Sequence, residues 1–159
     1  KSKQIGSSRY FTFVEFKETT VNSPRKGGIG NLKDYVNQQE NKEVHIFQNG
    51  SCLLSEWKGS FRDGYGTQTW PDGATYTGQW KDNKAYGSGK FTHVDGDTYE
   101  GQWANDKANG LVYTISKWSK VLGFRKDDLQ HGIGVETWVD TSKYEGEYSF
   151  GRKHGLGAY

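Results

Sequence analysis

The 159-residue sequence has one cysteine, two prolines and no methionine, and only 32% of its residues are apolar. Because Cys52 has no second cysteine to pair with, an internal disulfide and a cysteine-rich zinc site are excluded, and a reducing compartment such as the cytoplasm is favoured. No apolar run approaches the ~20 residues that a membrane-spanning helix needs. The sequence begins at Lys1 rather than at a methionine, so we expect its natural start to lie upstream.

The sequence also lacks an excess of one sign of charge. The net charge of +2 divides into +3 over residues 1–43, 0 over 44–120 and −1 over 121–159. A nucleic-acid partner is therefore not expected, because such proteins carry a clustered basic surface. The abundant residues are aromatic ones (15%) and glycine (22 residues). This combination is typical of short strands joined by glycine turns, with rings supplying the buried area.

The sequence repeats itself at an interval of 23 residues. Tyr76, Gly78, Gln79, Trp80 and Gly87 recur as Tyr99, Gly101, Gln102, Trp103 and Gly110. The repeat divides the chain into units at 53–75, 76–98, 99–120, 121–143 and 144–159. The third unit has Val112 in place of its second glycine, and the fourth has Val121 and Arg125 in place of aromatics. The fifth unit stops before its turn, so we expect the array to continue beyond residue 159.

Each unit is predicted to be an antiparallel hairpin. Alternation places Tyr76, Gly78 and Trp80 on one face of a strand, and a second strand is expected from about 89 to 94. Asp95-Gly96 suits a tight turn with positive φ, and residues 83–89 are expected to form a looser turn at the other end. Gly78 is expected to let an aromatic ring of a neighbouring hairpin lie against bare backbone.

These residues resemble MORN repeats (membrane occupation and recognition nexus). Units of that family have about 23 residues, open with Tyr-x-Gly-x-Trp/Tyr and carry a His/Asn-Gly-x-Gly turn, as in "YTGQWKDNKAYGSG" and "YEGEYSFGRKHGLG". The resemblance covers about 53–159. It implies an all-β fold: an elongated, single-layer antiparallel sheet of stacked hairpins. The family's repeats bind or position other molecules in cytoskeletal and axonemal scaffolds, in junction proteins and as appendages of enzymes.

Residues 1–43 do not match and are interpreted as a capping segment for the open edge of the sheet. It is predicted to contain a strand at 9–16, a loop at 22–31 and a short helix at 31–42. The array is placed at 44–159, where residues 43–57 read as a hairpin around Asn49-Gly50. Residues 44–52 are interpreted as half of a degenerate first unit.

No catalytic or metal-binding constellation is found in the sequence. His131 and His154 stand one unit apart, which is two strands or ~9.6 Å, too far to share a zinc ion through ~2.1 Å bonds. "VDGDT" lacks the later carboxylate of a calcium loop, and "KGGIG" lacks the Lys-Ser/Thr of a phosphate loop. The sequence therefore predicts no enzyme activity, no cofactor and no metal.

The aromatic residues at repeated positions have two compatible interpretations: they form the core, or they line a groove for a partner helix or peptide. The groove candidates are Trp57, Tyr76, Trp80, Tyr99, Trp103, Tyr144 and Tyr148. The leading hypothesis is a scaffold that docks a protein within a larger assembly, with a cytoskeletal or ciliary setting implied by the resemblance. One alternative is a peripheral membrane or phosphoinositide-binding module, which the neutral repeat region disfavours. Another is an appendage of an enzyme that lies outside this sequence.

Overall fold

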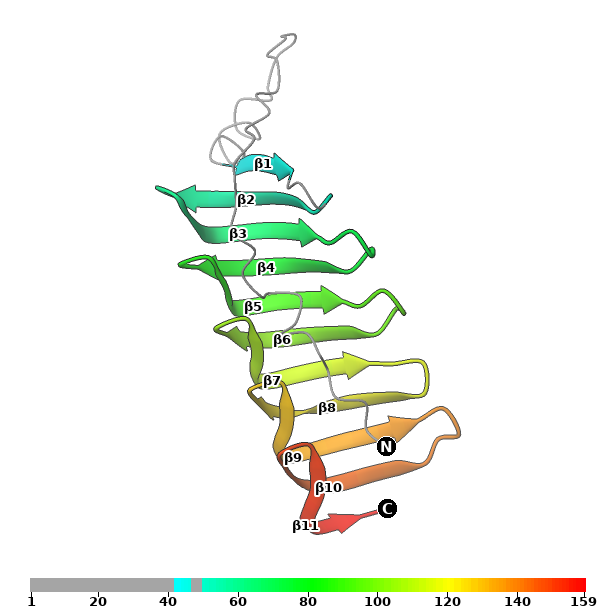
Figure 1. The fold of residues 1–159 in the computed structure, drawn as a ribbon. Coiled ribbons are helices and arrows are strands. Elements are labelled where there is room, and N and C mark those ends of the chain that lie inside the picture. Colours follow the sequence, from blue (N-terminus) through cyan, green and yellow to red (C-terminus); the bar gives the residue numbers. More distant parts are fainter. Residues whose placement is uncertain (1–41, 47–49) are drawn as a thin grey trace, which may run out of the picture.

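A computed structural model describes residues 42–46 and 50–159, and it shows one sheet of eleven strands in sequence order. Every neighbouring pair of strands is antiparallel. Figure 1 shows the strands stacked one after another along an elongated ribbon. The expected all-β array of hairpins is confirmed. The strand, loop and helix expected before residue 42 lie outside the described residues.

Each unit contributes two strands, and the irregular third and fourth units continue the sheet without a break. The strands are β1 (Lys42–Ile46), β2 (Cys52–Lys58), β3 (Phe61–Thr69), β4 (Thr75–Lys81), β5 (Lys84–Thr92), β6 (Thr98–Ala104), β7 (Lys107–Ile115), β8 (Ser119–Lys126), β9 (Leu129–Trp138), β10 (Lys143–Ser149) and β11 (Arg152–Ala158). Strands β1 and β2 pair with Val44 opposite Leu54, which confirms the hairpin expected at 43–57.

The turns at the two edges of the ribbon are both tight, which corrects one expectation. β5 begins at Lys84, so the loose turn predicted at 83–89 is instead a two-residue turn at Asp82-Asn83. Both residues have positive φ, at 48° and 67°, as a type I′ hairpin requires. Asp and Asn tolerate this conformation better than other side chains. At the other edge the predicted Asp95-Gly96 turn is confirmed, with Gly96 N donating to His93 O over 2.9 Å.

The two faces of the sheet differ in character. Tyr76, Gly78 and Trp80 of β4 are buried on one face, which we call the ladder face, while Thr75, Thr77 and Gln79 lie on the opposite face. The alternation predicted from the sequence is therefore confirmed for this strand.

Bare backbone at two glycines accommodates the ring of Tyr76. Gly78 of β4 and Gly89 of β5 are directly paired, and the Tyr76 ring lies over both. A Cβ added at Gly89 would collide with that ring, and one added at Gly78 would fall 2.7 Å from the Tyr76 hydroxyl oxygen. The contact matches the expected role of Gly78, except that the ring comes from the same hairpin and not from a neighbouring one.

Candidate functional site

The aromatic residues at repeated positions form a continuous cluster on the ladder face. The Tyr76 ring meets the rings of Trp80 and Trp103 edge-on, at centroid distances of 5.0 and 5.2 Å. The Tyr99 ring reaches the cluster through Phe91, at 6.3 Å. All four repeated rings are buried, and they stabilise the sheet by about 1.5–3 kcal/mol for each large side chain. The indole nitrogens of Trp80 and Trp103 donate to backbone carbonyls 14 residues earlier.

Of the remaining three groove candidates, one lies beside this cluster and two lie in a second group. Trp57 packs against it and contacts the His45 ring at 4.5 Å. Tyr144 and Tyr148 contact each other at 5.5 Å and form a second group near β11. In that group the Lys153 ammonium lies over the Tyr144 ring, 4.2 Å from its centroid. The structure therefore places all seven candidates along the ladder, in two groups of rings.

Two buried arginines were not predicted to belong to this site. The Arg62 guanidinium lies 4.3 Å from the centroid of the Trp80 ring and donates to Gln68 Oε1 over 2.8 Å. Arg125 stands where other units have tryptophan, and its guanidinium lies 5.7 Å from the centroid of the Tyr99 ring. Burial lowers the pKa of each arginine to about 10, so both remain charged at neutral pH. These cations therefore extend the ladder by stacking on rings.

Polar side chains at three of the tight turns join a hairpin to the preceding one. The Oδ1 atoms of Asn83, Asp106 and Asp128 accept hydrogen bonds from the backbone N–H groups of Arg62, Ala85 and Ala108. The three bonds measure 2.7–2.8 Å and recur at the repeat interval. They fix the spacing of hairpins along one edge of the ribbon. The sequence signal for them is an Asp or Asn that recurs at the same turn position.

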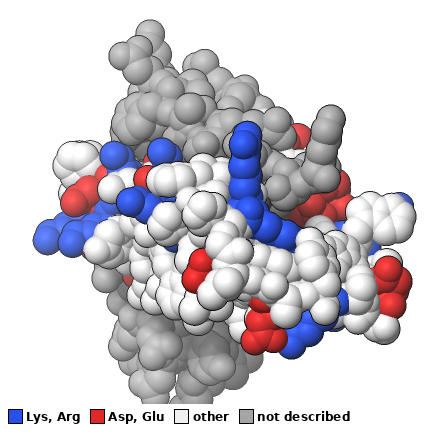
Figure 2. All heavy atoms as spheres, turned by 90° about the horizontal axis from the view of Figure 1, so that it is seen from below, with Lys and Arg blue, Asp and Glu red and all other residues white. Residues whose placement is uncertain are grey.

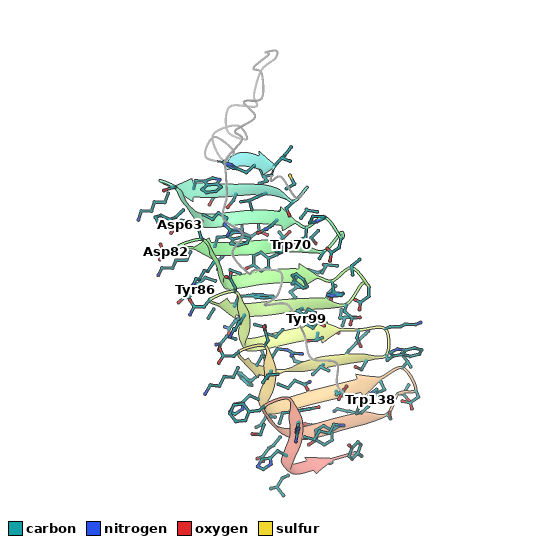
Figure 3. All side chains as sticks on the ribbon, in the orientation of Figure 1. Asp63, Trp70, Asp82, Tyr86, Tyr99 and Trp138 are labelled. Atoms are coloured by element: carbon teal, nitrogen blue, oxygen red, sulfur yellow. The ribbon has the colours of Figure 1, made fainter. Side chains whose placement is uncertain are left out.

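An open pocket of about 240 Å³ lies at this same edge. Trp80 lines it together with Asp63, Gln79, Lys81 and Tyr86. The Lys81 ammonium lies 5.3 Å from the centroid of the Tyr86 ring, which is exposed. Figure 3 shows Asp63 and Tyr86 at the edge of the ribbon, away from Trp70 and Tyr99. The pocket therefore forms an accessible aromatic margin at the edge of the ribbon, with Trp80 from the ladder face and with Gln79 and Lys81 from the opposite face.

The described residues contain neither a cluster of metal ligands nor a membrane-spanning helix. Within 42–46 and 50–159, no group of three or more His, Cys, Asp or Glu side chains is arranged to hold a metal ion. No helix in these ranges is long and apolar enough to cross a membrane. Figure 2, which looks onto the β11 end, shows acidic and basic side chains interspersed rather than gathered into regions of one sign.

Comparison with known proteins identifies the repeats. A family model described as MORN repeat matches residues 55–75, 76–98, 99–111, 126–143 and 144–159. No curated protein matches the chain. The matched residues make up more than half of the sequence, and each matched segment overlaps one of the hairpins described above. The chain therefore belongs to the MORN-repeat family, whose members are repeat proteins of protein or membrane interaction and are generally non-catalytic.

Proposed function

We propose that this chain is a non-enzymatic scaffold that docks a helix or peptide of a partner protein along the aromatic ladder face. The observation that carries the proposal is the ladder itself. Rings at repeated positions are locked by edge-on packing and by indole hydrogen bonds, so the surface is ordered before a partner arrives. A preorganised surface reduces the entropy that binding must overcome.

The ladder meets accessible surface where Trp80 lines the edge pocket, to which Gln79 and Lys81 contribute from the opposite face. Tyr86 is 46% exposed and lines the pocket with a lysine and an aspartate, so it offers both apolar area and polar partners. Aromatic residues of this kind are enriched among the energetically dominant residues of protein interfaces. Six of the seven ladder candidates are buried, so they act as the wall behind this margin, and a partner meets the ladder at the pocket.

Family membership supports interaction with either proteins or membranes, and the charges favour a protein. A lipid surface attracts clustered Lys and Arg, each contributing about 1 kcal/mol. The charges at the β11 end are interspersed, and residues 44–120 carry no net charge. Sedimentation with anionic vesicles at two salt concentrations tests the membrane alternative; a salt-sensitive association would favour it. A cytoskeletal or ciliary setting is proposed from the family resemblance alone.

Affinity capture from cells tests the docking proposal. Wild-type chain is compared with Tyr86→Ala and with the control Val139→Ala, which lies on an exposed turn. The three proteins are used at equal folded fraction. We expect the partners retained by wild type to be retained by the Val139 variant and lost from the Tyr86 variant. Equal retention by all three proteins would contradict docking at the ladder margin.

A further inference from the structure

The face opposite the ladder carries an apolar surface that a single sheet does not require for its own stability. It is confined to three neighbouring strands, β7, β8 and β9, where alternating residues point away from the ladder. We call it the outer patch, and it consists of Leu111, Tyr113, Ile115, Leu122, Phe124, Ile133 and Val135. Six of these seven side chains are exposed, with Phe124 at 52% and Ile133 at 66%.

The sheet register brings these side chains together in rows. Leu111 is paired with Phe124 and Tyr113 with Leu122, and Leu122 is in turn paired with Val135. Directly paired residues on one face have Cβ atoms about 5 Å apart, so the patch is contiguous. The family model matches residues up to 111 and again from 126, so the last four residues of β7 and all but the last residue of β8 fall outside the match.

Phe124 occupies a position that has a structural role in the other units. Glu56, Gln79, Gln102 and Glu147 stand at this position, each facing a bulge in the next strand. Each accepts a hydrogen bond, of 2.8–3.3 Å, from a backbone N–H in that bulge. A phenyl ring cannot accept this bond. The fourth unit therefore has an exposed ring where the other units have a stabilising acceptor, as expected for a surface kept for binding.

Charged side chains border the patch across the sheet. On β6, Glu100 is paired with Tyr113. On β10, Glu145 is paired with Val135 and Glu147 with Ile133. Lysines are close as well. Lys143 Nζ lies 2.9 Å from Glu145 and Lys90 Nζ lies 3.9 Å from Glu100, and Lys120 and Lys126 flank the patch along β8. On both neighbouring strands, β6 and β10, the charged residues paired directly with the patch are thus carboxylates.

These observations decide between the kinds of partner. β7, β8 and β9 are paired on both sides, so an extended peptide would find no free strand edge there, whereas a helix satisfies its own backbone. A second copy packed face to face about a two-fold axis parallel to the strands would bring Glu100 toward Glu145, and seven residues fall short of the roughly 20–30 per side of a stable interface.

We propose that the outer patch binds an amphipathic helix of a partner protein, with apolar residues along one face and Lys or Arg near both ends. The carboxylates on β6 and β10 are four strands apart, about 19 Å, which a helix covers in about 13 residues. The site lies on the face opposite the ladder, so it is a second docking surface. Its test does not depend on the ladder proposal.

Peptide selection on the full chain tests this proposal. A library of helical peptides of about 18 residues is selected on wild type and counter-selected on Phe124→Gln. The Gln variant restores the side chain found in two other units, so it is expected to fold at least as stably as wild type, which urea denaturation checks. Phe61→Gln is the matched control, because Phe61 is also 52% exposed and lies on β3.

We expect selected peptides to carry an apolar stripe with basic residues near both ends. Their affinity should fall about tenfold or more on Phe124→Gln and stay unchanged on Phe61→Gln and on Tyr86→Ala. Three results would overturn the proposal: no binder that depends on Phe124, binders with acidic ends, or a wild-type dimer in sedimentation that Phe124→Gln dissociates. The last result would instead identify the patch as an interface between copies.

Discussion

The Oδ1 atom of Asp106, in the turn between β6 and β7, accepts a 2.7 Å hydrogen bond from the backbone N–H of Ala85 in β5. The backbone N–H of Asp106 in turn donates to Ala85 O over 3.1 Å. This reciprocal contact ties two successive hairpins together at the edge of the ribbon. Because one hairpin cannot bury its own apolar face, the contacts between hairpins determine the stability of the whole array.

Substitution of Asp106 separates the role of the acceptor from the role of the charge. Asp106→Ala leaves a buried N–H without its acceptor and should lower the free energy of unfolding by about 1–2 kcal/mol. Asp106→Asn retains the acceptor, as Asn83 does in the preceding turn, and should be at least as stable as wild type at neutral pH. Urea denaturation measures both. Equal losses in the two variants would contradict this role of the side chain.

The pH dependence of the Asp106 variants has a defined sign. Burial raises the pKa of Asp106 above the ordinary aspartate value, despite opposing effects of the Ala85 N–H and Arg62. The folded state therefore keeps this proton to higher pH than the unfolded chain does. The free energy of unfolding falls as pH rises from the ordinary aspartate pKa to the raised pKa of the folded state. Asp106→Asn should lack this decrease. A matched control is Asp82→Asn, whose side chain is exposed.

Phe150 is expected to be a site where stability can be gained. It has a φ of 47°, in the left-handed region that bulky residues rarely adopt, whereas the equivalent positions hold Asp82, Asn105 and Asp127. Phe150→Asn should raise the free energy of unfolding by about 1 kcal/mol, because Asn tolerates this conformation. Phe61→Asn, at a position without positive φ, should give no gain. A destabilised Phe150 variant would show that its 5.2 Å contact with the His131 ring matters more than the backbone.

Alkaline conditions should weaken the ladder through its buried tyrosines. Burial raises the pKa of Tyr99 to about 12, from an ordinary value of 10.0. Between these values the folded state holds a proton that the unfolded chain releases, so stability decreases as pH rises from 10 to 12, by on the order of 2 kcal/mol for this residue. Urea denaturation at several pH values in this interval should give a shallower slope for Tyr99→Phe than for wild type. Identical slopes would mean that Tyr99 is more hydrated than its packing indicates.

Repetition explains what the sequence could predict. The hairpins, the ladder face and the glycine contact all follow from Tyr76, Gly78 and Trp80 recurring in register. Phe91 is fully buried at the centre of the ring cluster. Its burial could not be predicted from the repeat, because the equivalent residues in the neighbouring units are Gln68 and Thr114. These two polar side chains instead accept hydrogen bonds from the buried guanidinium groups of Arg62 and Arg125.

The outer patch could not be predicted because it does not follow the repeat. Ile115, Leu122 and Phe124 occupy positions that are polar in most other units, so the repeat pattern marks them only as departures. Leu111 and Ile133 share a position that is apolar in most units, so nothing in the repeat distinguishes them. Whether Leu122 and Phe124 are neighbours of Ile133 depends on the pairing of β8 with β9, which the sequence alone did not specify. The bulge opposite Phe124 likewise has no sequence signal beyond the glycine at 132, which has a φ of 79°.

A double-mutant cycle on Gly89 and Tyr76 tests most directly the claim that rings packed on bare backbone hold the ribbon together. Gly89 has no positive φ, and the three atoms nearest to a methyl group there all belong to the Tyr76 side chain. We predict that Gly89→Ala lowers the free energy of unfolding by about 3 kcal/mol in wild type and by less than about 1 kcal/mol in a Tyr76→Leu background, where the ring is absent. Equal losses in the two backgrounds, measured by urea denaturation, would contradict the account.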